Sequence, residues 1–235
     1  MATARTKKKI EIELASTLVG HWYKVGKKYY PSSTTILNAY PQSLQLTQWI
    51  AEKGWHESQR IKSEAGERGT RVHSGVERLL QKVILNKEEY SLEEWHKLYT
   101  FVSWHRAYNP RLVASELLLY SRKYGYAGRT DQVFEVSDKI VVCDTKTSGS
   151  IYDHYALQVA SYAQAYEEMG KGKVEETAIL QLGAKNKNGY RFVLYPDWRD
   201  HFKTFLAVKR VWEHDTGYGP DYEPPILDLP SELKL

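Results

Sequence analysis

Three consecutive segments with strand character place the strongest constraint on the fold of this 235-residue chain. They are residues 112–121 (LVASELLLYS), 126–136 (YAGRTDQVFEV) and 139–146 (KIVVCDTK), and short turns at 123–125 and 137–138 separate them. Apolar runs bounded by turn residues are typical of strands, and tight turns join antiparallel neighbours. The sequence therefore predicts a three-stranded antiparallel meander near the middle of the chain.

Helical patterns lie on both sides of this meander. We expect helix from about residue 42 to 84, because apolar residues recur there every three or four positions, at Val72, Val76, Leu79, Leu80 and Val83. A short helix is predicted at 34–40, after a hairpin at 21–31, and another helix at 93–108. Beyond the meander, helices are expected at 154–169, with Asp153 as N-cap, and at 198–214. Two strands, 173–184 and 190–196, lie between them.

These elements predict an α/β fold with a mixed central β-sheet flanked by helices. The strand after helix 154–169 is expected to return parallel to strand 139–146 through a right-handed crossover. We predict a single domain over residues 10–216, in which a helical N-terminal region, 33–108, covers a sheet core, 111–196. Residues 1–9 are expected to form a disordered basic tail, and residues 217–235 an irregular proline-rich tail.

The composition narrows the classes of partner and compartment. A net charge of +4 and a pI of about 8.9 favour a polyanionic partner such as a nucleic acid. The single cysteine, Cys143, excludes an internal disulfide and any four-cysteine cluster within one chain. No apolar run approaches the ~20 residues that span a bilayer, and the N-terminus does not read as a signal peptide. We therefore expect a reducing, cytoplasmic location.

Charged residues gather where the meander strands end. Asp144 and Lys146 are two residues apart, so they share one face of the third strand, while Asp131 lies on the neighbouring strand and Glu116 on the first. The sequence does not fix the register between these strands. Convergent carboxylates repel one another unless a hard cation such as Mg²⁺ or Mn²⁺ joins them. A lysine beside them suits hydrolysis of a phosphodiester by metal-activated water.

The order of these motifs resembles the PD-(D/E)XK nuclease superfamily in its RecB-like exonuclease branch. Gly128-Arg-Thr-Asp131 followed by Asp144-Thr-Lys146 matches the signature, although a DxK triplet alone is a weak signal. Residues 69–73 with Glu77 resemble the upstream GxxxH helix, and residues 158–162 resemble the QxxxY helix. Residues 30–49 resemble the N-terminal segment of many phage and mitochondrial members. The resemblance covers residues 31–166, and it implies a restriction-endonuclease-like core.

The resemblance also implies a role for each matching residue. Asp131 and Asp144 would bind the metal ion together with His73 and the backbone carbonyl of Thr145, and Lys146 would act on the attacking water. The remaining positions are Gln158 and Tyr162, which would hold DNA or the active-site lysine, and Glu116, an acidic position of some branches only. Arg71, between Gly69 and His73 on the same predicted helix, is a candidate to contact the phosphate backbone. Because the chain has one cysteine, it does not belong with the iron–sulfur members.

Each of these residues also has a purely structural interpretation. Asp131 could cap a turn, Asp144 and Lys146 could form an exposed pair at a strand end, and His73 could be a core histidine. Taken together, the motifs predict a metal-dependent DNA exonuclease that acts on single-stranded or linear ends in replication, recombination or repair, and the compact layout resembles phage proteins. The alternatives are an endonuclease for DNA junctions or RNA, and a non-catalytic nucleic-acid-binding module.

Overall fold

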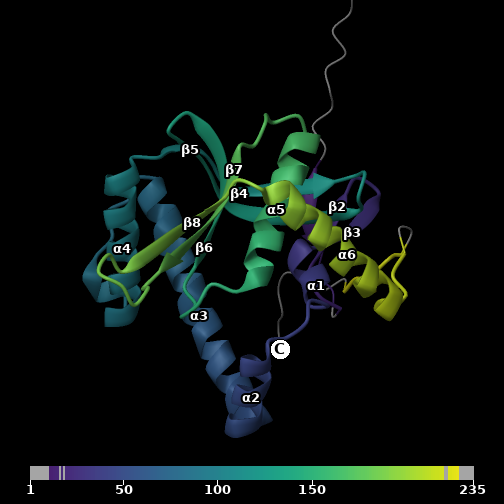
Figure 1. Ribbon diagram of the computed structural model, residues 1–235, viewed down its shortest axis with the longest axis horizontal. Helices are drawn as coiled ribbons and strands as arrows, with labels where there is room; N and C mark the ends of the chain where they lie inside the picture. The colour runs from purple at the N-terminus through teal and green to yellow at the C-terminus, as the bar shows by residue number, and fades with distance from the viewer. Residues whose placement is uncertain (1–10, 16, 18, 220–221, 228–235) are drawn as a thin grey trace, which may run out of the picture.

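The computed structural model describes residues 11–15, 17, 19–219 and 222–227, and Figure 1 shows the arrangement of its elements. The predicted tail at 1–9 lies outside these residues, as does much of the predicted tail at 217–235. The helices are α1 (Ser33–Leu37), α2 (Leu44–Lys53), α3 (Trp55–Leu80), α4 (Leu92–Tyr108), α5 (Asp153–Glu168) and α6 (Trp198–Thr216), with a 3₁₀ turn at Lys87–Glu89. None of the described helices is long and apolar enough to cross a membrane.

The central sheet has five strands in the order β4-β5-β6-β7-β8. Its members are β4 (Arg111–Ser121), β5 (Tyr126–Val136), β6 (Lys139–Lys146), β7 (Glu176–Leu182) and β8 (Tyr190–Tyr195). The first three form the predicted antiparallel meander, β7 returns parallel to β6, and β8 pairs antiparallel with β7. The predicted α/β fold with a mixed central sheet and a restriction-endonuclease-like core is therefore confirmed.

A smaller antiparallel sheet precedes the helical region. It consists of β1 (Ile12–Ala15), β2 (Trp22–Val25) and β3 (Lys28–Pro31), and the hairpin turns at Gly26-Lys27 as predicted. This sheet packs on the central one through a buried cluster of Tyr23, Val25, Tyr30 and Ala127. A bridge between Ser32 and Ala127 continues the contact into α1. The small sheet thus covers part of β5, a strand that carries one of the predicted site residues.

Helices cover both faces of the central sheet, so the core has two halves (Figure 1). Successive side chains of β6 alternate between them: Val142 belongs to the half beneath α5 and α6, whereas Val141 and Cys143 belong to the half beneath α3 and α4. The period of two then places Asp144 and Lys146 on the α5 side. Cys143 faces away from Asp144, as the alternation predicts.

The predicted helix over 42–84 is two helices, because the chain turns at Gly54 with a φ of 78°. The second helix ends at Leu80 in a Schellman motif, in which Val83 N–H donates to the carbonyl of Arg78 and Lys82 adopts a left-handed φ of 63°. Val83 therefore lies outside the helix with 40% of its surface exposed. Its predicted place on the buried helix face is wrong.

The N-cap predicted for α5 is also displaced. Tyr152 occupies the cap position without a side-chain hydrogen bond, and Asp153 is the first helical residue. An aspartate in the first turn interacts favourably with the positive end of the helix dipole, so it favours the same helix start by another route.

Candidate active site

Lys146 and Asp144 form a buried ion pair at the end of β6. The lysine Nζ lies 2.6 Å from Asp144 Oδ2, and 3% of the aspartate side chain is exposed. The ammonium also lies 4.5 Å from the centre of the Tyr155 ring on α5. A carboxylate and an aromatic face both stabilise an ammonium. The free-energy cost of burying this charged lysine is therefore lower than that of burying an unpaired one.

Asp131 lies opposite Asp144, one residue beyond the last paired residues of β5 and β6, Gln132 and Cys143. Its Oδ2 accepts a hydrogen bond from the backbone N–H of Thr145 at 2.8 Å. The carboxylate thereby accepts a hydrogen bond from a backbone N–H just beyond the last paired residues of β5 and β6. The two aspartates predicted from the sequence are thus brought together by neighbouring strands.

His73 joins this pair from α3. Its Nδ1 lies 3.2 Å from Asp131 Oδ2, the oxygen that Thr145 N–H contacts. Gly69, one turn earlier on α3, faces the end of β6, because a Cβ at this position would lie 3.1 Å from Thr147 Oγ1. In the GxxxH motif, Gly69 therefore lets α3 approach the end of β6 closely, and His73 then lies against Asp131.

Gln158 on α5 connects Lys146 with Asp144. Its Oε1 accepts a hydrogen bond from Lys146 Nζ at 3.0 Å, and its Nε2 donates to Asp144 Oδ1 at 3.1 Å. The same Nε2 lies 3.0 Å from the hydroxyl of Tyr162. The resemblance left DNA and the active-site lysine open as partners, and the lysine is the partner that Gln158 contacts here. Tyr162 is 3% exposed, so it supports Gln158 from beneath.

We expect Gly128→Ala to disturb this support, since a Cβ there would come within 2.5 Å of Tyr162 Cε1. Overpacking of a buried site costs about 1–3 kcal/mol, so the free energy of unfolding in urea should fall by that amount. Gly66→Ala is the control, because a Cβ on this exposed helix position meets nothing within 4 Å and alanine favours helix by up to ~1 kcal/mol. Equal stability of the two variants would contradict the packing of Tyr162 on Gly128.

The charges of these groups shift one another's pKa values. Burial raises the pKa of Asp144 to about 6, and the charge of Asp131 adds to this while Lys146 opposes it. Burial also acts to raise the pKa of Asp131, but the hydrogen bond and charge of His73 outweigh it and the net pKa is lowered. Burial opposes the charge of Lys146, yet the two aspartates raise its pKa. Lys146 is therefore a cation at neutral pH.

A cavity of about 490 Å³ opens beside this cluster. Its wall on one side is α3, with His73 and Glu77, and on the other side β4 and β5, with Glu116, Arg129 and Asp131. Asp144 and Lys146 do not line the cavity, because they lie behind Asp131 at the α5 face. The cavity therefore meets the cluster at His73 and Asp131.

Glu116 has an unusual backbone in the middle of β4. Its φ is 48°, a left-handed value that costs a non-glycine residue energy and often marks a functional site. Ser115 pairs with Gln132 and Leu117 with Thr130, so Glu116 lies opposite Asp131. Burial raises its pKa, and its carboxylate pairs with Arg129 Nε at 2.9 Å. Glu116, the acidic position predicted from the sequence, therefore lines the same cavity as Asp131 and His73.

Arg71 is engaged elsewhere. Its Nε donates to Glu94 Oε1 at 2.8 Å and its Nη2 donates to the carbonyl of Glu89 at 2.5 Å. Glu94 also forms a capping box with Ser91 at the start of α4. The guanidinium thus ties α3 to α4, and a contact with substrate would compete with these bonds. Arg129, one residue after Gly128 in the predicted motif, is the arginine that lines the cavity instead.

Within the described residues, no three His, Cys, Asp or Glu side chains are arranged to hold a metal ion. His73 and Lys146 lie against the aspartates in the places where a cation would compete with them. The two carboxylates are the donor type that a hard divalent cation takes, and the imidazole of His73 lies 3.2 Å from one of them, that of Asp131. Asp144 Oδ2 is buried and, apart from its ionic contact with Lys146, accepts no hydrogen bond. Metal binding stays a prediction.

Comparison with known proteins finds distant structural similarity only. No protein-family model matches the sequence, and no curated protein matches it either. The crystal structure of an alkaline exonuclease, LHK-Exo, from Laribacter hongkongensis covers 80% of this chain and 92% of its own, with 10% identity and a TM-score of 0.41. Its complex with dAMP gives a TM-score of 0.39 with 11% identity, covering 80% of this chain and 92% of its own. The structure of SSO0001 covers 79% of this chain and 75% of its own, with 13% identity and a TM-score of 0.41. This similarity is too distant to assign a function.

Proposed function

We propose that this protein is a metal-dependent deoxyribonuclease, and specifically an exonuclease that acts on single-stranded or linear DNA ends. The observation that carries the proposal is the cluster of buried Asp144 with the half-buried Asp131 and Lys146, in which Gln158 contacts both members of the ion pair. Withdrawing charged side chains from water is costly, and the chain would fold equally well with a solvated ion pair on its surface. Such an arrangement is typical of an active site.

Mg²⁺ or Mn²⁺ would be held by Asp131, Asp144, His73 and the carbonyl of Thr145. When bound, a divalent cation lowers the pKa of water and neutralises charge that develops on a phosphate. The cavity favours this assignment, since Glu77, Glu116 and Asp131 line it beside a single arginine, Arg129. Without added positive charge, these carboxylates would repel the phosphates of DNA.

Lys146 has the charge and the place to assist the attacking water. Its pKa is raised, so the side chain is an ammonium that donates hydrogen bonds and stabilises negative charge at the phosphate. Gln158 Oε1 accepts a hydrogen bond from the ammonium and so fixes the direction of its remaining N–H donors. Asp131 keeps its negative charge, because its pKa is lowered. The chain thus supplies a fixed cation and a fixed anion on adjacent strands.

Gln158→Ala is expected to lower kcat by about 10- to 100-fold, the usual loss when a residue that orients an active-site group is removed. KM should change less, because Gln158 is 6% exposed and its amide is engaged by Lys146 and Asp144. Tyr162→Phe removes only the hydroxyl that contacts Gln158 and should cause a smaller loss. Steady-state kinetics on a labelled oligonucleotide would measure both. A change confined to KM would contradict the positioning role.

The test of the proposed function is cleavage of end-labelled single-stranded DNA, duplex DNA and covalently closed circles, each with Mg²⁺, Mn²⁺ or EDTA. Metal-dependent shortening of linear DNA that spares circles supports the exonuclease, and the position of the label gives its polarity. Cutting of circles supports an endonuclease instead. Salt-sensitive DNA binding without cleavage under any condition would replace the proposal with a non-catalytic binding module.

A further inference from the structure

A second cavity, of about 170 Å³, lies away from the active-site cavity. It opens where the small sheet, the β4–β5 turn and the end of α6 meet, and we call it the aromatic–basic pocket. Its charged residues, among those that the structure describes, are the cations Lys28, Arg122, Lys123 and Lys209 and one carboxylate, Glu213. The carboxylate pairs with Lys209. The pocket therefore has an excess of positive charge and attracts anions.

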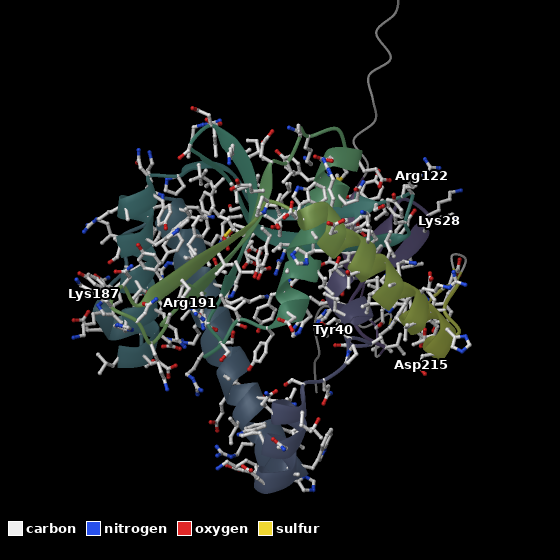
Figure 2. All side chains as sticks on the ribbon, viewed as in Figure 1. Lys28, Tyr40, Arg122, Lys187, Arg191 and Asp215 are labelled. Atoms are coloured by element: carbon white, nitrogen blue, oxygen red, sulfur yellow. The ribbon has the colours of Figure 1, made fainter. Side chains whose placement is uncertain are left out.

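The cations are placed in two layers. Lys209 is 9% exposed, and its Nζ lies 4.0 Å from the point where a Cβ of Gly125 would be, so it forms part of the floor beneath the β4–β5 turn. Arg122 and Lys123 are exposed on that turn. Arg122 forms no ion pair with any described residue, while Lys123 lies over the ring of Tyr124 at 4.9 Å. Figure 2 shows Arg122 beside Lys28 at one end of the molecule.

Aromatic rings supply the rest of the pocket wall. Trp22 and Trp212 contact one another with ring centres 6.1 Å apart, and Tyr218 packs against both. Tyr29 also lines the pocket, is half-buried, and has no ring partner among the described residues. Tyr29 packs in part against the core cluster of Trp22 and Trp212, and the rest of its ring faces the pocket. An aromatic side chain at a pocket wall beside several cations is the combination that proteins use to stack a base and hold its phosphate.

The size and place of the pocket restrict the ligand. Its volume of about 170 Å³ is below the ~300–1,000 Å³ typical of pockets for drug-sized ligands, so it admits only a small group, such as a base or a phosphate. It opens at the end of β4 near Ser121, whereas Glu116 on the same strand lines the active-site cavity. Five residues of strand span about 17 Å.

We propose that the aromatic–basic pocket binds one nucleotide of the DNA strand whose scissile bond lies in the active-site cavity. The base stacks on Tyr29, and the phosphate contacts Arg122 and Lys123. This inference rests on the proposed nuclease function, and it assigns to the protein a second DNA-binding position apart from the site of cleavage.

The experiment measures binding of fluorescein-labelled (dT)₂₀ by anisotropy in EDTA over a series of salt concentrations. Arg122→Ala/Lys123→Ala should bind about tenfold more weakly, and the slope of log K against log salt should become shallower by ~0.7 for each phosphate that the variant no longer neutralises. Tyr29→Leu should also weaken binding about tenfold, but with an unchanged salt slope, since stacking does not release counterions. The control is Lys187→Ala/Arg191→Ala, which removes equal charge at the opposite end of the molecule in Figure 2. It should bind nearly as the wild type does.

Unchanged (dT)₂₀ affinity in the pocket variants would overturn the inference. An equal fall in affinity in the control variant would overturn it too, because it would show that any loss of positive charge weakens DNA binding. Thymidine 5′-monophosphate and inorganic phosphate are tested as competitors. If either probe binds the pocket while the variants bind (dT)₂₀ as the wild type does, the pocket is a site for a free nucleotide or phosphate and not for a DNA strand. Cleavage of (dT)₃, too short to reach both sites, should be equal in wild type and pocket variants. Absence of (dT)₂₀ cleavage by the wild type with either Mg²⁺ or Mn²⁺ would end the proposed function, while the anisotropy result would still decide the pocket.

Discussion

Lys146→Met is expected to abolish DNA cleavage while leaving the affinity for a divalent cation intact or higher. Methionine keeps the length and apolar contacts of the lysine but removes the ammonium that lies 2.6 Å from Asp144. Removal of one charged group that stabilises a transition state costs about 10²–10³-fold in kcat. A cation competes with this ammonium for the same carboxylate, so Mn²⁺ should bind at least as tightly in the variant. Cleavage assays and titration calorimetry measure the two effects separately.

The matched control is Lys139→Met at the opposite end of β6, where the lysine pairs with Glu176 on the surface. It should keep the wild-type rate. Thermal unfolding of both variants shows whether the fold is retained. If Lys146→Met kept the wild-type rate, or lost metal affinity together with activity, the role of this lysine in the reaction would be wrong.

Asp144→Asn is expected to remove both activity and metal affinity. The amide has nearly the same shape as the carboxylate, but it lacks the charge and one of the two acceptor oxygens that a hard cation needs. We expect kcat to fall by at least about 100-fold, and the calorimetric signal for Mn²⁺ to weaken strongly. The contrast with Lys146→Met is the informative point. One variant should lose the metal and the other should keep it.

Asp138→Asn controls for the substitution itself. Asp138 is exposed in the turn between β5 and β6 with a φ of 62°, a conformation that asparagine tolerates well. Activity and stability should both stay close to wild type. Wild-type Mn²⁺ affinity in Asp144→Asn would contradict its assignment as a metal ligand, whatever the rate of cleavage.

Much of the fold could be predicted from alternation and turn residues. A period of two fixes the face of each strand residue, and a slip by one residue would bury charge and expose valine, so the meander and the shared face of Asp144 and Lys146 follow from local pattern. The end of a helix was harder to predict where an unusual residue type occupies the position that ends it. Lys82 holds the left-handed position that glycine usually occupies, so nothing in the sequence marked the end of α3 before Val83.

The long-range contacts of the site could not be predicted from local pattern. Sequence spacing places Arg71 on the same helix as His73, but the partner that engages it, Glu94, lies 23 residues further along the chain. The positive φ of Glu116 depends on the packing around β4 and has no signal in residue type. The contact of Gln158 with the buried ion pair likewise requires knowing how α5 lies on the sheet. The motifs indicated these residues, and the packing decided their partners.

The most direct test of the metal-dependent site is the rate of cleavage of an end-labelled single-stranded oligonucleotide as a function of Mn²⁺ concentration, for wild type, Asp144→Asn and Lys146→Met. We predict a rate that rises and saturates with Mn²⁺ for the wild type, is zero in EDTA, and stays near zero for both variants at every concentration. Cleavage by the wild type in EDTA, or a saturating wild-type rate in either variant, would contradict the assignment of Asp131, Asp144 and Lys146 as a metal-dependent nuclease centre.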